Sequence, residues 1–380
     1  MKNIIVALFG LLICIPVLSQ NENNTANIDY SYQSQSVYPV KTIAPTKGKK
    51  VKNVILMIGD GMGISHLSSA WVANRGNMFI DNVMYTGIVR TNAYNKLITD
   101  SGAAATAMAT GEKANYHAIS VDPNTNAPLT SLTDLANAKG MSTGILVTCG
   151  LTDATPATFC ANNPDRENLE DIAVDFTTCN VNFIFGGGRD DFHNRKSDNR
   201  DLLAEMEAQG YQVCSTIKET LNANSDKILA IVEEGQLAAA QERGDIFQKA
   251  TGKALETLNK NKKGFFAMIE GSRIDDYGHY NDLPKLVEEI GDFDRTIGQV
   301  LEWAEKDGKT LVIILSDHET GGLSITGGSL ENGMVEGKFA NKGHSGILIP
   351  VYAYGPQSQY FTGIMENTEI FEKIKTLLKL

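Results

Sequence analysis

The 380-residue chain has few positive charges for its size. Lys and Arg number 34 against 45 Asp and Glu, which gives a formal net charge of −11 at pH 7. A nucleic-acid backbone would meet a repelling field on most faces, so we expect no nucleic-acid-binding role. The chain is 42% hydrophobic and can bury a sizeable core, which excludes a disordered or fibrous protein. Its length allows two ordinary domains or one large α/β unit.

Long apolar runs are absent apart from the N-terminus, where residues 4–17 are apolar, follow a positive charge and precede a plausible cleavage site. We therefore predict a signal peptide over residues 1–20 and export to a periplasmic or extracellular location. Lipidation at Cys14 is an alternative, but the bulky Ile13 stands where a small residue is needed. Elsewhere no stretch approaches the roughly 20 apolar residues of a membrane span, so we expect no span in the mature chain.

Cysteine is also scarce. After removal of the signal peptide four cysteines remain, and an even number in an oxidising compartment permits up to two disulfides. Three pairings are open, and the sequence does not choose among them. These residues are Cys149, Cys160, Cys179 and Cys214.

What the chain does have is a series of short apolar runs that alternate with helical patterns. Such a series predicts an α/β fold, a three-layer sandwich whose mostly parallel central sheet is flanked by helices. Residues 21–49 have the composition of a linker or extended arm, folding is expected to start near Val51, and residues 201–261 have a mostly helical pattern. The predicted strands are 54–58, 145–148, 183–185, 265–269, 311–315 and 347–352.

Ligands of such sheets bind beyond the carboxyl ends of the strands, so the residues that follow each run are candidates for a site. The first run ends at Asp60, which has glycines on both sides. This carboxylate either caps the next helix, the commoner use of such a turn, or serves as a hard metal ligand. A dinucleotide fingerprint fits less well, because its third glycine is missing.

Histidines occur beside carboxylates at two further strand ends. Asp317 and His318 are adjacent, while Asp275 and His279 lie four residues apart and share one face if the segment is helical. His344 precedes the last run. An oxygen and nitrogen donor set of this kind suits zinc. Any one of these histidines alone is equally well explained as a structural side chain.

Ser101 is the candidate nucleophile. It opens a run of small residues that predicts a helix, so backbone amides and the helix dipole would favour an anion there. Without a histidine base, this serine would need a metal to lower its pKa. The alternative is that Asp100 or Ser101 is simply the cap of an Ala-rich helix.

Two further groups would complete a phosphate site. Asp153, Thr155 and Glu270 offer only oxygen atoms, and together with Asp60 they form a donor set typical of magnesium. Arg166 carries a guanidinium that can bind two phosphate oxygens, although it also resembles an ordinary surface arginine at a helix start.

Taken together, these motifs resemble the alkaline phosphatase family, in the family's order, from Val51 to about Pro356. The resemblance implies a single alkaline phosphatase catalytic domain over residues 50–380, with two zinc ions and one magnesium ion, a Ser101 nucleophile and a phosphate-binding Arg166. It also implies the ligand sets: Asp275, His279 and His344 for the first zinc; Asp60, Asp317 and His318 for the second; and Asp153, Thr155 and Glu270, bridged by Asp60, for magnesium.

The implied activity is the hydrolysis of small-molecule phosphate monoesters. Two zinc ions would clamp the attacking and leaving oxygens, and the reaction would pass through a phosphoserine. The competing hypotheses are a phosphodiesterase or sulfatase on the same scaffold, and a non-catalytic metal-binding surface protein. The magnesium set and Arg166 argue against a diesterase, and every matched position holds a competent residue, which argues against loss of catalysis.

The chain departs from the family in two places. Asp276 adds a negative charge directly after a predicted zinc ligand, where many relatives have Lys, His or Trp, and this charge is expected to weaken phosphate binding and speed its release. The segment between His318 and His344 is too short for the extra domain that some relatives use at their dimer contact. A homodimer is therefore one of the oligomeric states that the sequence allows.

Overall fold

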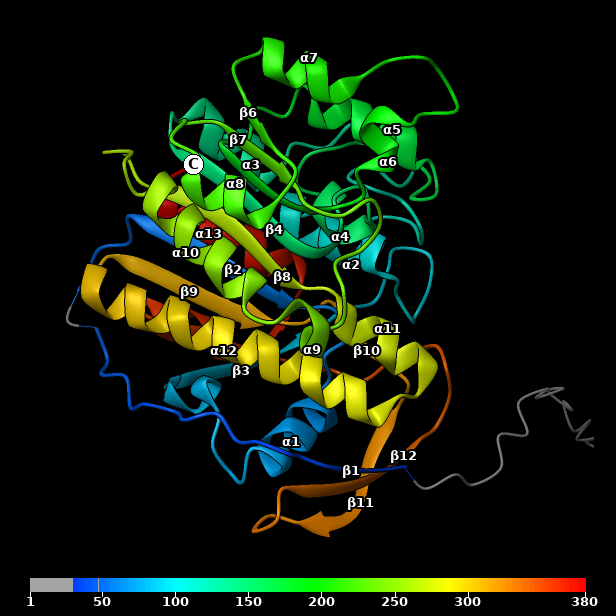
Figure 1. The fold of residues 1–380 in the computed structure, drawn as a ribbon, viewed down its shortest axis with the longest axis vertical. Helices are drawn as coiled ribbons and strands as arrows, with labels where there is room; N and C mark the ends of the chain where they lie inside the picture. The colour runs from blue at the N-terminus through cyan, green and yellow to red at the C-terminus, as the bar shows by residue number, and fades with distance from the viewer. Residues whose placement is uncertain (1–29, 47) are drawn as a thin grey trace, which may run out of the picture.

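A ten-stranded sheet forms the middle of the part of the chain that the structure describes, residues 30–46 and 48–380 (Figure 1). The structure is a computed structural model. The predicted signal peptide and residues 21–29 lie outside the described residues. In spatial order the strands are β15 (Gly363–Glu366), β3 (Tyr85–Arg90), β14 (Ile349–Tyr354), β9 (Thr310–Leu315), β2 (Asn53–Gly59), β8 (Phe265–Gly271), β4 (Ser142–Gly150), β5 (Phe183–Gly187), β7 (Ile228–Ile231) and β6 (Gln212–Cys214).

Most of this sheet is parallel. The strands from β9 to β6 all run in one direction. Strand β14 is antiparallel to both of its neighbours, and β15 is parallel to β3. Parallel strands need long crossover connections, and helices supply them here. The predicted α/β fold with a mostly parallel central sheet is confirmed.

The helices belong to two groups, one for each face of the sheet. Their bounds are α1 (Ile64–Ala73), α2 (Ser101–Thr110), α3 (Leu132–Ala138), α4 (Ala154–Ala157), α5 (Leu169–Phe176), α6 (Asp190–His193), α7 (Leu202–Ala208), α8 (Ile217–Asn222), α9 (Ala240–Arg243), α10 (Ile246–Leu258), α11 (Arg273–Tyr280), α12 (Leu283–Asp307) and α13 (Thr368–Leu378). Two 3₁₀ turns, Phe79–Asn82 and Ser358–Phe361, complete the helical elements of the described residues.

Strand β2 shows why the sheet needs cover on both faces. All seven of its residues are buried, and they alternate between two apolar layers. Val54 and Leu56 pack in the layer that includes α2, α3, α5 and α13. Ile55 and Met57 pack in the layer that includes α1, α10 and α12. A strand buried on both sides reads as one continuous apolar run, which is the pattern by which its sequence predicts it.

All six predicted strands are present in the large sheet, but the sequence does not predict its strands β3 and β15, and two further expectations need correction. The last run begins at Ile349 rather than at 347, because Ile347 and Leu348 are exposed before the strand. The expectation that residues 201–261 are mostly helical is only partly right, since β6 and β7 lie within that segment. Strand β7 is a run of four apolar residues between helices, too short for periodicity to separate a strand from a helix.

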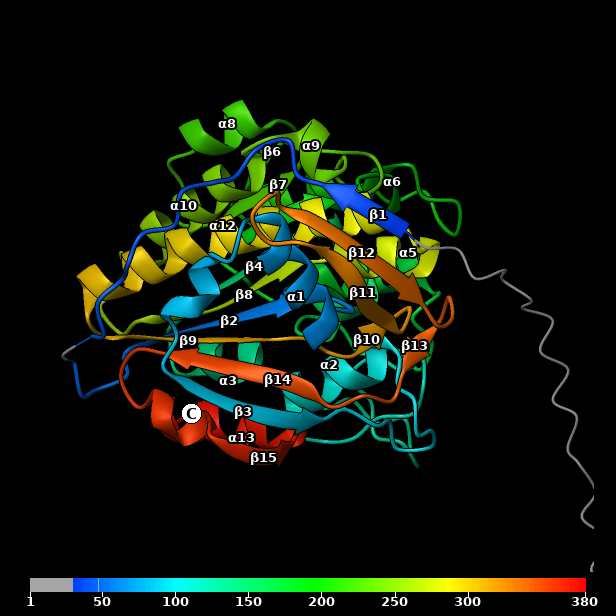
Figure 2. The ribbon, with the colours of Figure 1, turned by 90° about the horizontal axis from the view of Figure 1, so that it is seen from below.

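Two small sheets lie beside the large one. Strand β1 (Tyr30–Gln33) pairs with β12 (Met334–Phe339), which pairs with β11 (Leu323–Ser329). Part of the predicted extended arm therefore forms a strand (Figure 2). Strands β10 (Glu319–Thr320) and β13 (His344–Ser345) form the second small sheet, with Thr320 opposite His344.

One disulfide is present among the four cysteines. Cys160 and Cys179 are joined, whereas Cys149 and Cys214 are free and buried. The structure thus holds one of the two disulfides that the sequence permits. Among the described residues, no helix combines the length and the apolar character needed to cross a membrane.

Candidate active site

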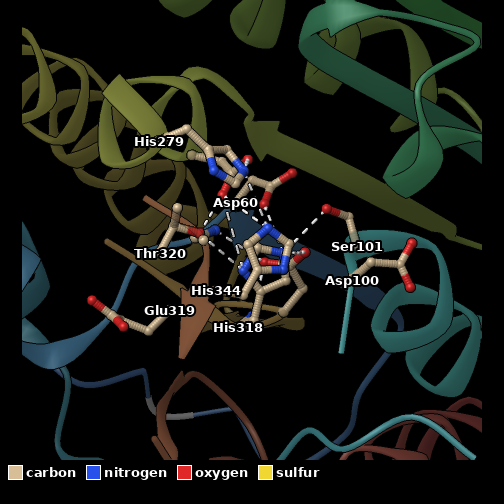
Figure 3. Close-up of polar contacts among 12 residues, drawn as sticks. Asp60, Asp100, Ser101, His279, His318, Glu319, Thr320 and His344 are labelled. Carbon is tan, nitrogen blue, oxygen red and sulfur yellow. Dashed lines mark hydrogen bonds and ion pairs between the residues drawn. The ribbon is translucent and has the colours of Figure 1, made fainter. Parts of the chain in front are cut away.

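The polar residues that follow β2, β8, β4 and β9 meet at one edge of the sheet. The four strands are parallel neighbours, and their registers bring Ile58 opposite both Glu270 and Leu315. Their carboxyl ends therefore lie at the same edge. The short pairing of β10 with β13 adds His344, which comes from a later part of the chain. Figure 3 shows Asp60, His279, His318 and His344 converging on one region.

Ser101 is the first residue of helix α2, and Asp100 is its cap. The Asp100 carboxylate accepts hydrogen bonds from the amides of Gly102 and Ala103. Every residue of α2 is buried, and their small side chains let the helix lie close to its neighbours. The capping alternative thus holds for Asp100. It leaves Ser101 free to project its hydroxyl from the helix start towards the histidines (Figure 3).

His318 lies at the centre of the first group of donors. Its Nε2 atom is 3.1 Å from Ser101 Oγ, 3.1 Å from an oxygen of Asp317 and 3.5 Å from Asp60 Oδ1. The ring is fully buried. The capping alternative for Asp60 is wrong, because helix α1 begins at Ile64 after Gly63, and the Asp60 carboxylate faces His318 instead.

A second group surrounds Asp275. His279 Nε2 is 3.1 Å from one Asp275 oxygen, and His344 Nε2 is 3.7 Å from the other. The two Nε2 atoms are 3.2 Å apart. On the far side of each ring, Nδ1 faces a backbone carbonyl, that of Lys342 for His279 and that of Thr99 for His344. Rings held in this way leave both Nε2 atoms in a position where one cation would bind them.

Four buried oxygen atoms at this edge have no hydrogen-bond partner among the described residues. A buried oxygen left without a hydrogen bond is costly, and a bound cation would remove the cost. All four belong to residues that the sequence predicts as metal ligands. They are Asp60 Oδ1, Thr155 Oγ1, Glu270 Oε1 and Asp317 Oδ2.

Arg166 lies between two carboxylates beside the serine. Its guanidinium donates to Asp100 Oδ2 at 3.2 Å and to Asp153 Oδ1 at 2.9 Å. Its side chain is 20% exposed, so part of the guanidinium still reaches solvent. Burial opposes the charge, but Asp153 and Asp100 hold the pKa of Arg166 above its usual value. The group is therefore a fixed cation near Ser101.

A family model described as alkaline phosphatase matches residues 51–342. The chain belongs to the alkaline phosphatase family. Members of this family are metal-dependent phosphatases. The residues that the sequence singles out, which lie together at one edge of the sheet, therefore belong to a phosphatase of this kind. This chain is a phosphatase, a hydrolase with a metal-binding site.

Individual relatives cover most of the chain. Alkaline phosphatase 4 of Bacillus subtilis (strain 168) is 32% identical, with 86% of this chain and 89% of that protein aligned. Alkaline phosphatase of Escherichia coli (strain K12) is 28% identical over 87% of each. Among solved structures, the alkaline phosphatase from the Antarctic bacterium TAB5 superposes with a TM-score of 0.82 at 36% identity, over 87% of this chain and 99% of that one. A variant of that enzyme has been solved with Mg in its M3 site.

Two sets of side chains at this edge of the sheet have the geometry to hold a cation. Asp275, His279 and His344 form one, as the sequence predicts. The second combines Asp60 and His318 with Asp275, so that Asp275 is shared, whereas the sequence predicts Asp317 in that place. Asp317 nevertheless contacts the same His318 nitrogen. An exposed group with suitable geometry, Asp190, His193 and Glu234, lies elsewhere on the surface.

The pKa values at the site show how strongly the buried carboxylates repel one another when they are charged. Burial and the neighbouring acids raise the pKa of Asp60 and Glu270 well above their usual values. Burial also raises the pKa of Asp317 to about 6. The hydrogen bond with Asp275 raises the pKa of His279 to about 9, so this ring carries a proton that a metal would displace. Divalent cations would relieve the mutual repulsion of these acids.

Sequence reasoning gave no role to Thr320. Its hydroxyl contacts Asp275 and lies 3.2 Å from His318 Nδ1, so it joins the two groups of donors (Figure 3). Gly61 also matters here. It has φ +68°, and a Cβ on it would lie 2.7 Å from Asp275 Oδ1, which only glycine avoids. The position of Thr320 two residues beyond His318 was the one available signal.

The extra negative charge at Asp276 has a partner. Its carboxylate accepts from Arg273 Nε at 3.0 Å, and Arg273 also donates to the Leu237 carbonyl. Burial raises the pKa of Asp276. The ion pair with Arg273 offsets part of the negative charge of Asp276. Only the remaining charge would weaken phosphate binding as the sequence predicts.

Proposed function

We propose that this phosphatase hydrolyses phosphate monoesters through a phosphoserine intermediate on Ser101. The observation that carries the proposal is the position of Ser101 Oγ, 3.1 Å from His318 Nε2 at the edge of a buried group of metal-type donors. Arg166 supplies a cation beside it. Transfer of a phosphoryl group requires a nucleophile, a cation that binds the phosphoryl oxygens, and groups that hold metal ions. Ser101, the Arg166 guanidinium and the buried oxygens without hydrogen bonds can fill these roles.

We infer two zinc ions and one magnesium ion as cofactors. The mixed nitrogen and oxygen donors at Asp275, His279 and His344, and at His318 with Asp60 and Asp317, suit zinc. Asp153, Thr155 and Glu270 offer only oxygen, which suits magnesium. When bound, such ions supply positive charge to the attacking and leaving oxygens. The unpaired oxygens of Asp60, Thr155, Glu270 and Asp317 support this assignment.

The residues of this chain then have separate tasks. Ser101 Oγ attacks phosphorus, the bond from phosphorus to the ester oxygen breaks, and the alcohol leaves. A water oxygen next attacks phosphorus, the bond to Oγ breaks, and inorganic phosphate leaves with Ser101 restored. Arg166 binds two non-bridging oxygens throughout. The amides at the start of α2 add partial positive charge to the same region.

Chelation tests the proposal. Hydrolysis of an aryl phosphate at alkaline pH should fall to background in the chelated protein and return with zinc plus magnesium. Metal analysis of the restored protein should find two zinc and one magnesium per chain, and its melting temperature should rise again, because ligands that bind the native state stabilise it. Turnover that persists without metal would refute the proposal.

We also propose that residues 1–20 direct export and that residues 50–380 form a single catalytic domain. The mass of the protein recovered from the secreted or periplasmic fraction should correspond to a chain that begins near residue 21. Expression of residues 50–380 alone tests the domain boundary, since it removes β1, which pairs with β12, and the arm, whose Ile43 amide donates to Asn82. A full-length chain retained in the cytoplasm would contradict export.

A further inference from the structure

A cavity lies at the opposite edge of the central sheet from the active site. It has a volume of about 540 Å³ and is formed by segments that precede β2, β4, β8 and β9, together with the end of α13. Figure 2 shows β2 crossing the molecule from this edge to the edge where β10 and β13 lie. Lysines dominate its lining: Lys49, Lys50, Lys52, Lys139, Lys263 and Lys309.

The charge of these lysines is not compensated locally. Among the described residues, none of the six has a carboxylate within ion-pair distance. Lys139 Nζ donates to the carbonyls of Leu378 and Lys379, and Lys263 Nζ donates to the Lys139 carbonyl. Carbonyl oxygens orient the ammonium groups but do not neutralise them.

One carboxylate, Asp307, also lines the cavity. Its Oδ2 already accepts from Asn53 Nδ2, from the Lys309 amide and from Thr310 Oγ1. This acid therefore holds the turn before β9 rather than pairing with the lysines. Six lysines around one cavity, on a chain of net charge −11, concentrate positive charge there, and an anion in the cavity would offset it.

We propose that this cavity binds a compact, multiply phosphorylated anion. Lysine ammonium groups are point charges with three donors each, which suits the oxygens of several phosphates. The described residues that line the cavity include no aromatic side chain, so they offer nothing for a nucleobase to stack on. The acidic surface elsewhere repels a long polyanion, so the ligand is a small phosphate cluster rather than a nucleic acid.

The cavity lies far from the candidate catalytic residues. The seven residues of β2 span roughly 20 Å at about 3.3 Å per residue, and the candidate active site begins directly after that strand. An anion bound at the amino ends of the strands leaves Ser101 accessible. The same chemistry is offered by a free polyphosphate and by the phosphate headgroups of a lipid surface, so the site would hold the phosphatase near phosphate-rich material.

The test uses inositol hexakisphosphate with metal-loaded Ser101→Ala protein, which should not consume it. We expect Lys49→Gln, Lys50→Gln and Lys309→Gln together to weaken binding at the cavity at least about tenfold. The control, Lys196→Gln, Lys218→Gln and Lys249→Gln, removes the same charge elsewhere and should change the affinity less than about twofold. With Ser101 retained, the cavity variant should hydrolyse an aryl phosphate at the unaltered rate.

Lysine acetylation gives a second readout that needs no cavity substitution. The anion should slow acetylation of Lys49, Lys50 and Lys309 and leave Lys196, Lys218 and Lys249 unprotected. Vesicles of phosphatidylcholine with phosphatidic acid distinguish the two sources: sedimentation of the protein with them identifies a headgroup, and binding of the soluble anion alone identifies a free polyphosphate. Equal loss of binding in both triple variants, or no protection of the cavity lysines, would overturn the proposal.

Discussion

Asp100 serves two neighbours at once, because it caps helix α2 and holds Arg166. Asparagine caps a helix as well as aspartate does, but it carries no charge. Asp100→Asn should therefore keep the cap of α2 but lower kcat/KM for an aryl phosphate about tenfold, the order expected for loss of one charged hydrogen bond, and lose only the stability that the charge supplies. Asp100→Ala should also lower the free energy of unfolding by about 1 kcal/mol. Equal activity of Asp100→Asn and the wild type would contradict this role.

The same carboxylate gives a pH dependence of known sign. Burial alone would raise the pKa of Asp100, but the His117 amide and Arg166 outweigh it and lower the pKa below 3.8. A lowered pKa in the folded state means stabilisation that is present above the unfolded value and lost as the pH falls through the folded value. The difference in unfolding free energy between wild type and Asp100→Asn should thus shrink from pH 7 towards pH 3 in urea titrations. A difference that grows on acidification would reverse the sign.

Arg166 should distinguish monoesters from diesters. A monoester dianion offers more charged non-bridging oxygens to the guanidinium than a diester does. Arg166→Ala should therefore lower kcat/KM for an aryl monoester by about 10- to 100-fold, and that for the matching diester by less. Rates on the two esters with the same leaving group measure this. A loss of the same size on both would remove the main support for monoesters as substrates.

For single residues, the sequence predicts the chemical role of a side chain better than it predicts which other side chains it contacts. Asp60, His318 and Ser101 stand out because of their type and their position after apolar runs, and all three meet in the structure. The capping alternative for Asp60 could not be decided from a turn motif alone. Thr320 could not be assigned a role either, since its contacts depend on how β9, β10 and α11 are packed.

At the scale of elements, the Cys160–Cys179 disulfide ties the segment after α4 to the end of α5 across 19 residues. A cross-link over a loop of this length contributes about 3 kcal/mol by limiting the unfolded chain. Cys160→Ala with Cys179→Ala should lower the free energy of unfolding by that order in urea titrations. A reductant should have the same effect on the wild type and none on the double variant. Sensitivity of the double variant to reductant would place the effect at another site.

Elements buried on both faces were the easiest to predict. Strands β2, β8 and β9 contain continuous apolar runs, and the sequence alone places their ends within two residues. Strand β7 was missed because four apolar residues do not establish a period. Strand β1 was missed because its partner β12 lies some 300 residues away, and only that pairing makes it a strand.

At the scale of the whole molecule, the sheet separates two charged regions. Acidic donors gather at the carboxyl ends of the parallel strands, and lysines gather at the amino ends. The overall charge of −11 describes neither region, since bound divalent ions would make the acidic one locally positive. A net charge that argues against nucleic acid as a partner is therefore compatible with a phosphate substrate.

Capture of the covalent intermediate tests the central claim most directly. The metal-loaded protein would be mixed with an aryl phosphate, quenched in acid within milliseconds to seconds, digested and sequenced by mass spectrometry. We predict phosphate on the peptide that contains Ser101, with the modification at Ser101 itself, and none on the Ser101→Ala protein. Phosphate on another residue, or on the Ser101→Ala protein at the wild-type level, would contradict the account.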